Sequence, residues 1–117
     1  MEKYITTQYG VAPEYLWRAY PTFAIFRNQN NRKWFALFMS ITRDKMGMDG
    51  TAEIDVLNIH CPADVVSTLL PADAFRPGYH MNKEHWVSIP LNNRLADGQI
   101  IPLIDESFKS VAPRTKH

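Results

Sequence analysis

Cysteine is almost absent from this chain of 117 residues, and it has none of the long apolar runs of membrane proteins. The single cysteine, Cys61, excludes a disulfide within the chain and fits a reducing compartment. No segment approaches the roughly 18 consecutive apolar residues of a membrane helix. The first residues include Glu2 and Lys3 and form no apolar signal core. We therefore expect a cytoplasmic protein with no membrane partner.

Sequence signatures of catalysis are missing as well. The chain contains no G-x-x-x-x-G-K phosphate loop, no G-x-G-x-x-G and no G-x-S-x-G. His80 and His85 lie five residues apart beside Glu84, but no third metal ligand is near them in the sequence. Hydrogen-bonding histidines are the simpler interpretation. We therefore expect a protein that is not an enzyme and that has neither a cofactor nor a metal site.

The residues that are present suit one globular domain over residues 1–117, because 45% of them are hydrophobic. Apolar periodicity, prolines and a capping residue predict helices over residues 1–9, 14–20, 62–70 and 97–111. In the second of these we expect Leu16 and Trp17 to face inward. Alternating apolar residues predict strands over residues 23–26, 34–42, 52–60 and 86–91.

Strand 34–42 is apolar on both faces, which is typical of a central strand. Its expected faces are Phe35, Leu37, Met39 and Ile41 on one side, and Trp34, Ala36 and Phe38 on the other. In strand 52–60 the apolar alternation changes phase after Val56, which predicts a bulge there. The order of elements predicts an α+β fold, an antiparallel sheet of about four to five strands with helices packed on one face.

The net charge of +1 says little about partners, but the basic residues are concentrated in the connections. Loops 28–33 and 43–51 are basic and rich in asparagine or glycine, a chemistry that suits phosphate contacts. Because successive hairpin turns alternate, we expect these loops at opposite ends of the sheet. The candidate DNA-binding residues are Arg27, Arg32, Lys33, Arg43, Lys45, Arg76, Lys83 and Arg94.

The stretch from His80 to Val111 carries the most specific pattern of the chain. Its residues are His80, Asn82, Lys83, His85 and Trp86, then Asp97, and then Ile104, Asp105, Ser107 and Phe108. This pattern resembles the MmcQ/YjbR family. The resemblance implies a bacterial protein with a CyaY/frataxin-like fold that binds double-stranded DNA through a double-wing motif. Loops 28–33 and 43–51 would then be the wings.

Three functions remain open at this stage. The first is a non-enzymatic module, expected to be a monomer, that binds double-stranded DNA through the basic residues. The second is a protein-interaction or small-ligand domain that uses the surface from Tyr79 to Trp86. The third is a frataxin-like metal accessory protein that uses the acidic residues Asp49, Glu53, Asp55, Asp64 and Asp73. The motif also has a structural interpretation, with Asn82 capping a turn, His85 bonding a carbonyl and Trp86 packed under the last helix.

Overall fold

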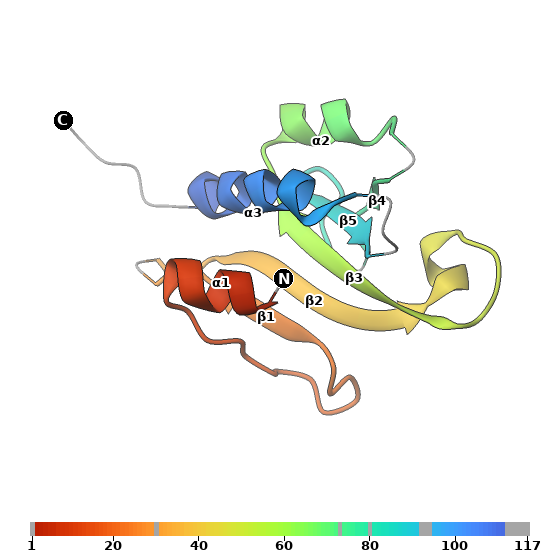
Figure 1. The fold of residues 1–117 in the computed structure, drawn as a ribbon, viewed down its shortest axis with the longest axis horizontal. Coiled ribbons are helices and arrows are strands. Elements are labelled where there is room, and N and C mark those ends of the chain that lie inside the picture. The colour runs from red at the N-terminus through yellow and green to blue at the C-terminus, as the bar shows by residue number, and fades with distance from the viewer. Residues whose placement is uncertain (1, 30, 73, 80, 92–94, 112–117) are drawn as a thin grey trace.

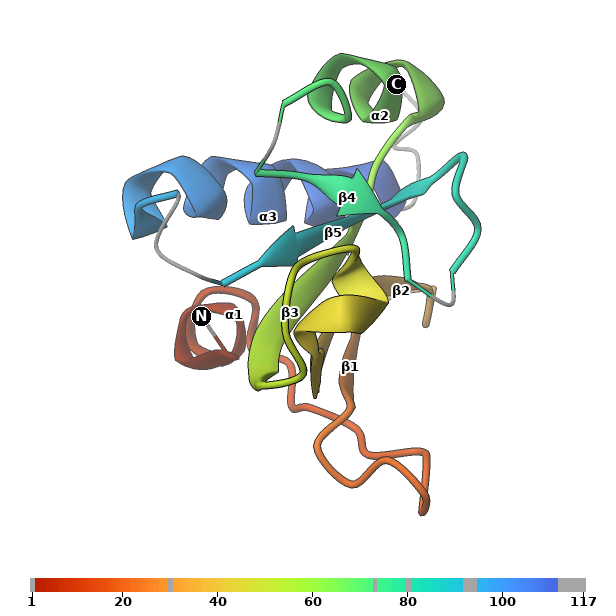
Figure 2. The same cartoon turned by 90° about the vertical axis from the view of Figure 1, so that its right-hand side faces the viewer.

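The computed structural model describes residues 2–29, 31–72, 74–79, 81–91 and 95–111. The elements along the chain are α1 (Glu2–Tyr9), β1 (Ala24–Arg27), β2 (Trp34–Thr42), the 3-10 helix η1 (Arg43–Met46), β3 (Glu53–His60), α2 (Ala63–Leu69), β4 (Arg76–Pro77), β5 (Trp86–Pro90) and α3 (Asp97–Val111) (Figures 1 and 2). The strands form one antiparallel sheet in the order β1-β2-β3-β5-β4. The predicted α+β class is confirmed. No helix in these ranges is long and apolar enough to cross a membrane.

The helices cover one face of the sheet, where the larger apolar core lies. α3 packs on β2 and β3, and the buried Ile5 of α1 and Val66 of α2 belong to the same core. Asp105 of α3 accepts hydrogen bonds from the hydroxyls of Tyr4 and Tyr9. The carboxylate of Asp105 therefore ties α1 to α3 on the helical face.

The opposite face of the sheet is also apolar, and irregular chain covers it in place of helices. We call it the loop-covered face. Its cluster is made of Phe23, Ile25, Leu37, Met39, Ile41, Met46, Ile54 and Val56. The partly buried Trp17 packs against this cluster from the α1–β1 connection, and Tyr79 and Met81 pack against it from the β4–β5 connection. A 117-residue chain thus builds a sheet that is buried on both sides.

The bulge predicted in strand 52–60 is wrong. β3 pairs with β2 in a regular register over its whole length. The change of phase in the sequence arises because both faces of β3 are buried. Ile54 and Val56 join the cluster of the loop-covered face, whereas Leu57 and Ile59 join the core under the helices.

A bulge does occur between β1 and β2, where the register shifts between Phe26 and Arg27. It places Phe35 in the core under the helices and Trp34 on the loop-covered face, with Leu37. The predicted faces of Trp34 and Phe35 are therefore wrong, because an extra residue in one strand reverses the alternation beyond it.

The predicted helix over residues 14–20 is also wrong. The backbone N–H and C=O of Glu14 bond to Ile25 at 2.9 Å each, so this residue extends the edge of β1 instead of entering a helix. Leu16, expected inside, is 48% exposed. Asp97 is the capping residue that the sequence predicts for the last helix, but it lies inside the first turn of α3. The N–H of Ala96, just before the helix, donates to Gln99 Oε1 at 2.9 Å.

Candidate functional site

The segment that follows β4 is fixed over the loop-covered face by two buried polar side chains. Asn58 of β3 and Ser88 of β5 are both 0% exposed. The N–H of Tyr79 donates to Ser88 Oγ at 2.9 Å, and Asn58 Nδ2 donates to the carbonyl of Tyr79 at 3.1 Å. Ser88 Oγ donates in turn to Asn58 Oδ1. Buried polar groups need such partners, so this network sets the path of the chain here.

Three cations converge beside this segment. Lys45 of η1, Arg76 of β4 and Lys83 of the β4–β5 connection line one cavity of about 220 Å³ together with Met46, Pro77 and Tyr79. The guanidinium of Arg76 donates from Nε to the carbonyl of Met46 at 3.2 Å, which joins β4 to η1. Lys83 Nζ donates to the carbonyl of Gly78 at 3.2 Å. The described residues that line the cavity include three cations and no carboxylate, so they give it positive charge.

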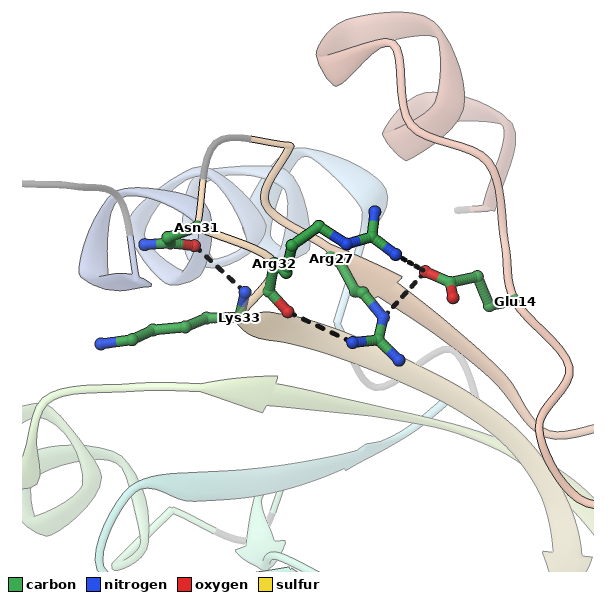
Figure 3. A network of polar contacts seen from close by, with 5 residues as sticks. All are labelled: Glu14, Arg27, Asn31, Arg32 and Lys33. Carbon is green, nitrogen blue, oxygen red and sulfur yellow. Dashed lines mark hydrogen bonds and ion pairs between the residues drawn. The ribbon is translucent and has the colours of Figure 1, made fainter.

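The basic residues of the β1–β2 turn lie at the other end of β2 from η1, as expected (Figure 1). Figure 3 shows that they form a local network. Arg27 pairs with Glu14 at 2.9 Å. The guanidinium carbon of Arg27 also lies 5.7 Å from the ring centre of Trp34. Arg32 reaches the same Glu14 carboxylate at 3.7 Å, and Lys33 is exposed. Glu14 thus offsets one of the three positive charges of this turn.

Two of the predicted basic residues remain, Arg43 and Arg94. Arg43 Nε donates to the carbonyl of Asp49 at 2.9 Å and closes the loop that η1 begins. Arg94 lies outside the described residues. The structure therefore brings loop 43–51 together with β4 and the β4–β5 connection, and it does not bring it together with loop 28–33.

The motif residues near β5 make contacts that hold a turn. Asn82 Oδ1 accepts the N–H of Glu84 at 2.8 Å, and the carbonyl of Asn82 accepts the N–H of His85 at 3.2 Å. The carbonyl of His85 accepts the N–H of Cys61 at 2.7 Å, and its Nδ1 lies 3.4 Å from the carbonyl of Cys61. Trp86 is 7% exposed. His80 lies outside the described residues.

His85 also stacks on a second histidine. The rings of His60 and His85 lie 5.7 Å apart at 10°, and His60 Nδ1 is 2.8 Å from Ser110 Oγ. Burial, followed by the charges of His85 and Lys33, lowers the pKa of His60. In the described ranges, no group of three His, Cys, Asp or Glu side chains could hold a metal ion. Asp73, one of the five acidic residues considered for a metal accessory protein, lies outside the described residues.

A second cavity, of about 410 Å³, lies on the same face. Its lining residues are Trp17, Tyr20, Phe23, Trp34, Leu37, Met39 and Met81. They come from the chain before β1, from β2 and from the β4–β5 connection. We call it the aromatic cavity, because four of its seven lining residues carry aromatic rings.

Comparison with known proteins identifies the group of relatives. A model of the YjbR family matches residues 6–110. The chain belongs to the YjbR family. Over 106 residues it is 42% identical to the uncharacterized protein YyaQ of Bacillus subtilis, an alignment that covers 91% of this chain and 90% of YyaQ.

Solved structures of similar chains share the fold of this YjbR-family protein. A crystal structure of a protein from Pseudomonas syringae is 35% identical, with a TM-score of 0.90 and 95% of each chain covered. A solution NMR structure from Pseudomonas syringae is 34% identical, with a TM-score of 0.87, and covers 99% of this chain and 93% of the other.

Two features of this YjbR-family chain escape sequence reasoning. The meeting of Lys45 with Arg76 and Lys83 depends on how η1 folds back, which no local pattern records. The aromatic cavity was missed altogether. The available signal is the density of rings in Trp17, Tyr20 and Phe23 just before β1; of these three, the predicted helix over residues 14–20 turns only Trp17 inward.

Proposed function

We propose that this YjbR-family protein is a non-enzymatic module that binds double-stranded DNA through phosphate contacts from Lys45, Arg76 and Lys83. The observation that supports this proposal most directly is their convergence on one cavity from three separate segments. Phosphate binding uses lysine and arginine side chains of this kind, and neutralising several phosphates gives affinity that depends on salt.

The other basic residues are weaker candidates for phosphate contacts. Arg27 and Arg32 share the carboxylate of Glu14, and Arg43 does not line the cavity that Lys45, Arg76 and Lys83 share. A phosphate approaching either arginine of the β1–β2 turn would meet a negative charge nearby. The proposed face therefore uses one of the two loops expected as wings, loop 43–51, together with the segment from Arg76 to Lys83.

Low sequence specificity is part of the proposal. Reading bases in the major groove requires an element, often a helix, that projects its side chains into the groove. α3 instead packs its buried residues Ile100, Ile104 and Val111 on the sheet. Contacts to the backbone alone position a protein on DNA without selecting a sequence.

The test is fluorescence anisotropy of a labelled random duplex of about 20 base pairs, titrated at several salt concentrations. Native protein is expected to bind with an affinity that falls steeply as salt rises. In the double variant Lys45→Ala/Lys83→Ala, the slope of log K against log salt should fall by about 1.8, because each lost phosphate contact removes about 0.9.

A matched control removes two exposed lysines elsewhere. Lys33→Ala/Lys109→Ala changes the net charge by the same amount and should keep the slope of the native protein. Circular dichroism and urea midpoints establish that both variants are folded. Equal losses in the two double variants would place the contacts elsewhere, and an absence of duplex binding at low salt would refute the proposed function.

A second candidate, binding of a small ligand, is favoured by the aromatic cavity beside Met81.

A further inference from the structure

The aromatic cavity is built from rings that hold one another in place. The indole of Trp17 meets Trp34 edge to face at 5.7 Å and meets Phe23 at 6.0 Å. Tyr20 stacks on Phe23 with ring centres 4.8 Å apart. Such edge-to-face and offset contacts are the favoured arrangements of aromatic rings. The walls of the cavity are therefore positioned before any guest enters.

Trp34 is also held by a cation. The guanidinium of Arg27 lies 5.7 Å from the Trp34 ring centre and pairs with Glu14 at 2.9 Å. A cation over a ring adds attraction, and the carboxylate keeps that cation in place. The network in Figure 3 thus supports a wall of the cavity, which gives Arg27 a role other than DNA contact.

The size and lining of the cavity define the shape of a guest. Its volume of about 410 Å³ lies within the range of small-molecule sites, roughly 300–1,000 Å³. Among the described residues that line it, none is charged. Apolar walls with aromatic rings favour a flat apolar guest, because ring stacking adds to the burial of apolar area.

The neighbouring cations define the charge of a guest. Met81 lines the aromatic cavity, whereas Tyr79 and Lys83, two residues away on either side, line the cavity that also contains Lys45 and Arg76. Two residues of chain span at most about 7 Å, so one short segment borders both cavities. An acidic group on a bound ring system would meet positive charge at that border.

We propose that the aromatic cavity binds a free small molecule with two fused or linked aromatic rings and one negatively charged group, with the rings among Trp17, Tyr20 and Trp34 and the anion toward Lys83. This proposal does not rest on DNA binding, although the two would share Lys83. It assigns a ligand class to a part of the loop-covered face that the DNA proposal does not use.

The test uses two probes that differ mainly in charge. 1-Anilinonaphthalene-8-sulfonate carries a sulfonate, and N-phenyl-1-naphthylamine is its uncharged relative. Titrated into the native protein, both should quench the emission of Trp17 and Trp34 with saturation. The anionic probe should bind roughly two- to five-fold more tightly, the size expected for one solvent-exposed charge pair. No saturable binding of either probe would overturn the proposal.

Two matched pairs of variants locate the probe. Tyr20→Ala removes a cavity wall, whereas Tyr15→Ala removes a ring of similar exposure, 58% against 50%, from the same loop without touching the cavity. We expect about ten-fold weaker binding of both probes in the first and native binding in the second. Equal effects would mean that the probes bind to the exposed loop and would overturn the proposed site.

Lys83→Ala tests the anion. This variant should remove the preference for the sulfonate probe and leave the affinity for the neutral probe unchanged. The control variant Lys33→Ala should change neither the preference nor the affinity. A preference that survives in Lys83→Ala would refute the placement of the anion. Displacement of the neutral probe by single-stranded oligothymidylate would overturn the assignment to a free small molecule, because an unpaired base would then occupy the aromatic cavity.

Discussion

Gly78 stands where the chain turns from β4 into the segment over the loop-covered face. A Cβ added there would lie 2.6 Å from the Cβ of Trp86 and 2.9 Å from its carbonyl oxygen. The N–H of Gly78 donates to that same oxygen at 3.1 Å, so the two segments cannot separate without losing this hydrogen bond. Gly78→Ala therefore forces β4 away from β5.

The cost of this substitution follows from the kind of atom that must move. Trp86 is buried, and its Cβ and carbonyl belong to β5, so no flexible side-chain end can give way. Overpacking of this sort costs about 1–3 kcal/mol of unfolding free energy. For a domain of this size about 1 kcal/mol corresponds to roughly 4 °C, so we expect a melting temperature about 4–12 °C lower.

A second glycine supplies the control for this measurement. Gly98 lies in the first turn of α3, and a Cβ there would meet nothing within 4 Å. Gly98→Ala should raise the stability by up to about 1 kcal/mol, because alanine loses less backbone entropy in a helix. Thermal unfolding followed by circular dichroism compares both variants. If Gly78→Ala melts at the native temperature, the close approach of Gly78 to Trp86 is not rigid and the reasoning fails.

Two further predictions concern titratable groups. Burial, His85 and Lys33 lower the pKa of His60 in the folded chain, so the unfolded chain binds the proton more readily and stability should fall as the pH drops below about 6.5. Urea midpoints at pH 7.5 and 5 should therefore differ less in His60→Asn than in the native protein, and an identical difference would contradict the argument. Burial raises the pKa of the Cys61 thiol to about 12, so Ellman's reagent should label it only after denaturation; rapid labelling of the native protein would show an open site.

The elements that could be predicted from the sequence are those whose pattern is local. The spacing of Ile100, Ile104 and Val111 predicts a helix, and all three are buried on one side of α3. The alternation in residues 52–60 predicts a strand, and β3 is the centre of the sheet. These patterns repeat within a few residues, so they need no knowledge of distant partners.

The elements that could not be predicted depend on pairings between distant segments. Glu14 and its neighbours read as a helix, yet the backbone of Glu14 is taken by Ile25 of β1. The face of Trp34 depends on a bulge that becomes visible only once the partner strand is known. The aromatic cavity depends on these two features, because residues before β1 and residues of β2 line it. The sequence shows Lys45, Arg76 and Lys83 as basic residues, but their grouping around one cavity depends on the bond from Arg76 to Met46.

The two coverings of the sheet differ in what specifies their shape. On the helical face, repeated backbone hydrogen bonds set the geometry, and many sequences satisfy such a rule. On the other face, a few side chains that bond to the main chain set the path, among them Asn58, Ser88 and Arg76. A substitution of Asn58 or Ser88 would leave a buried polar partner unsatisfied and would loosen the covering segment. The shape of this face therefore depends on a few individual side chains.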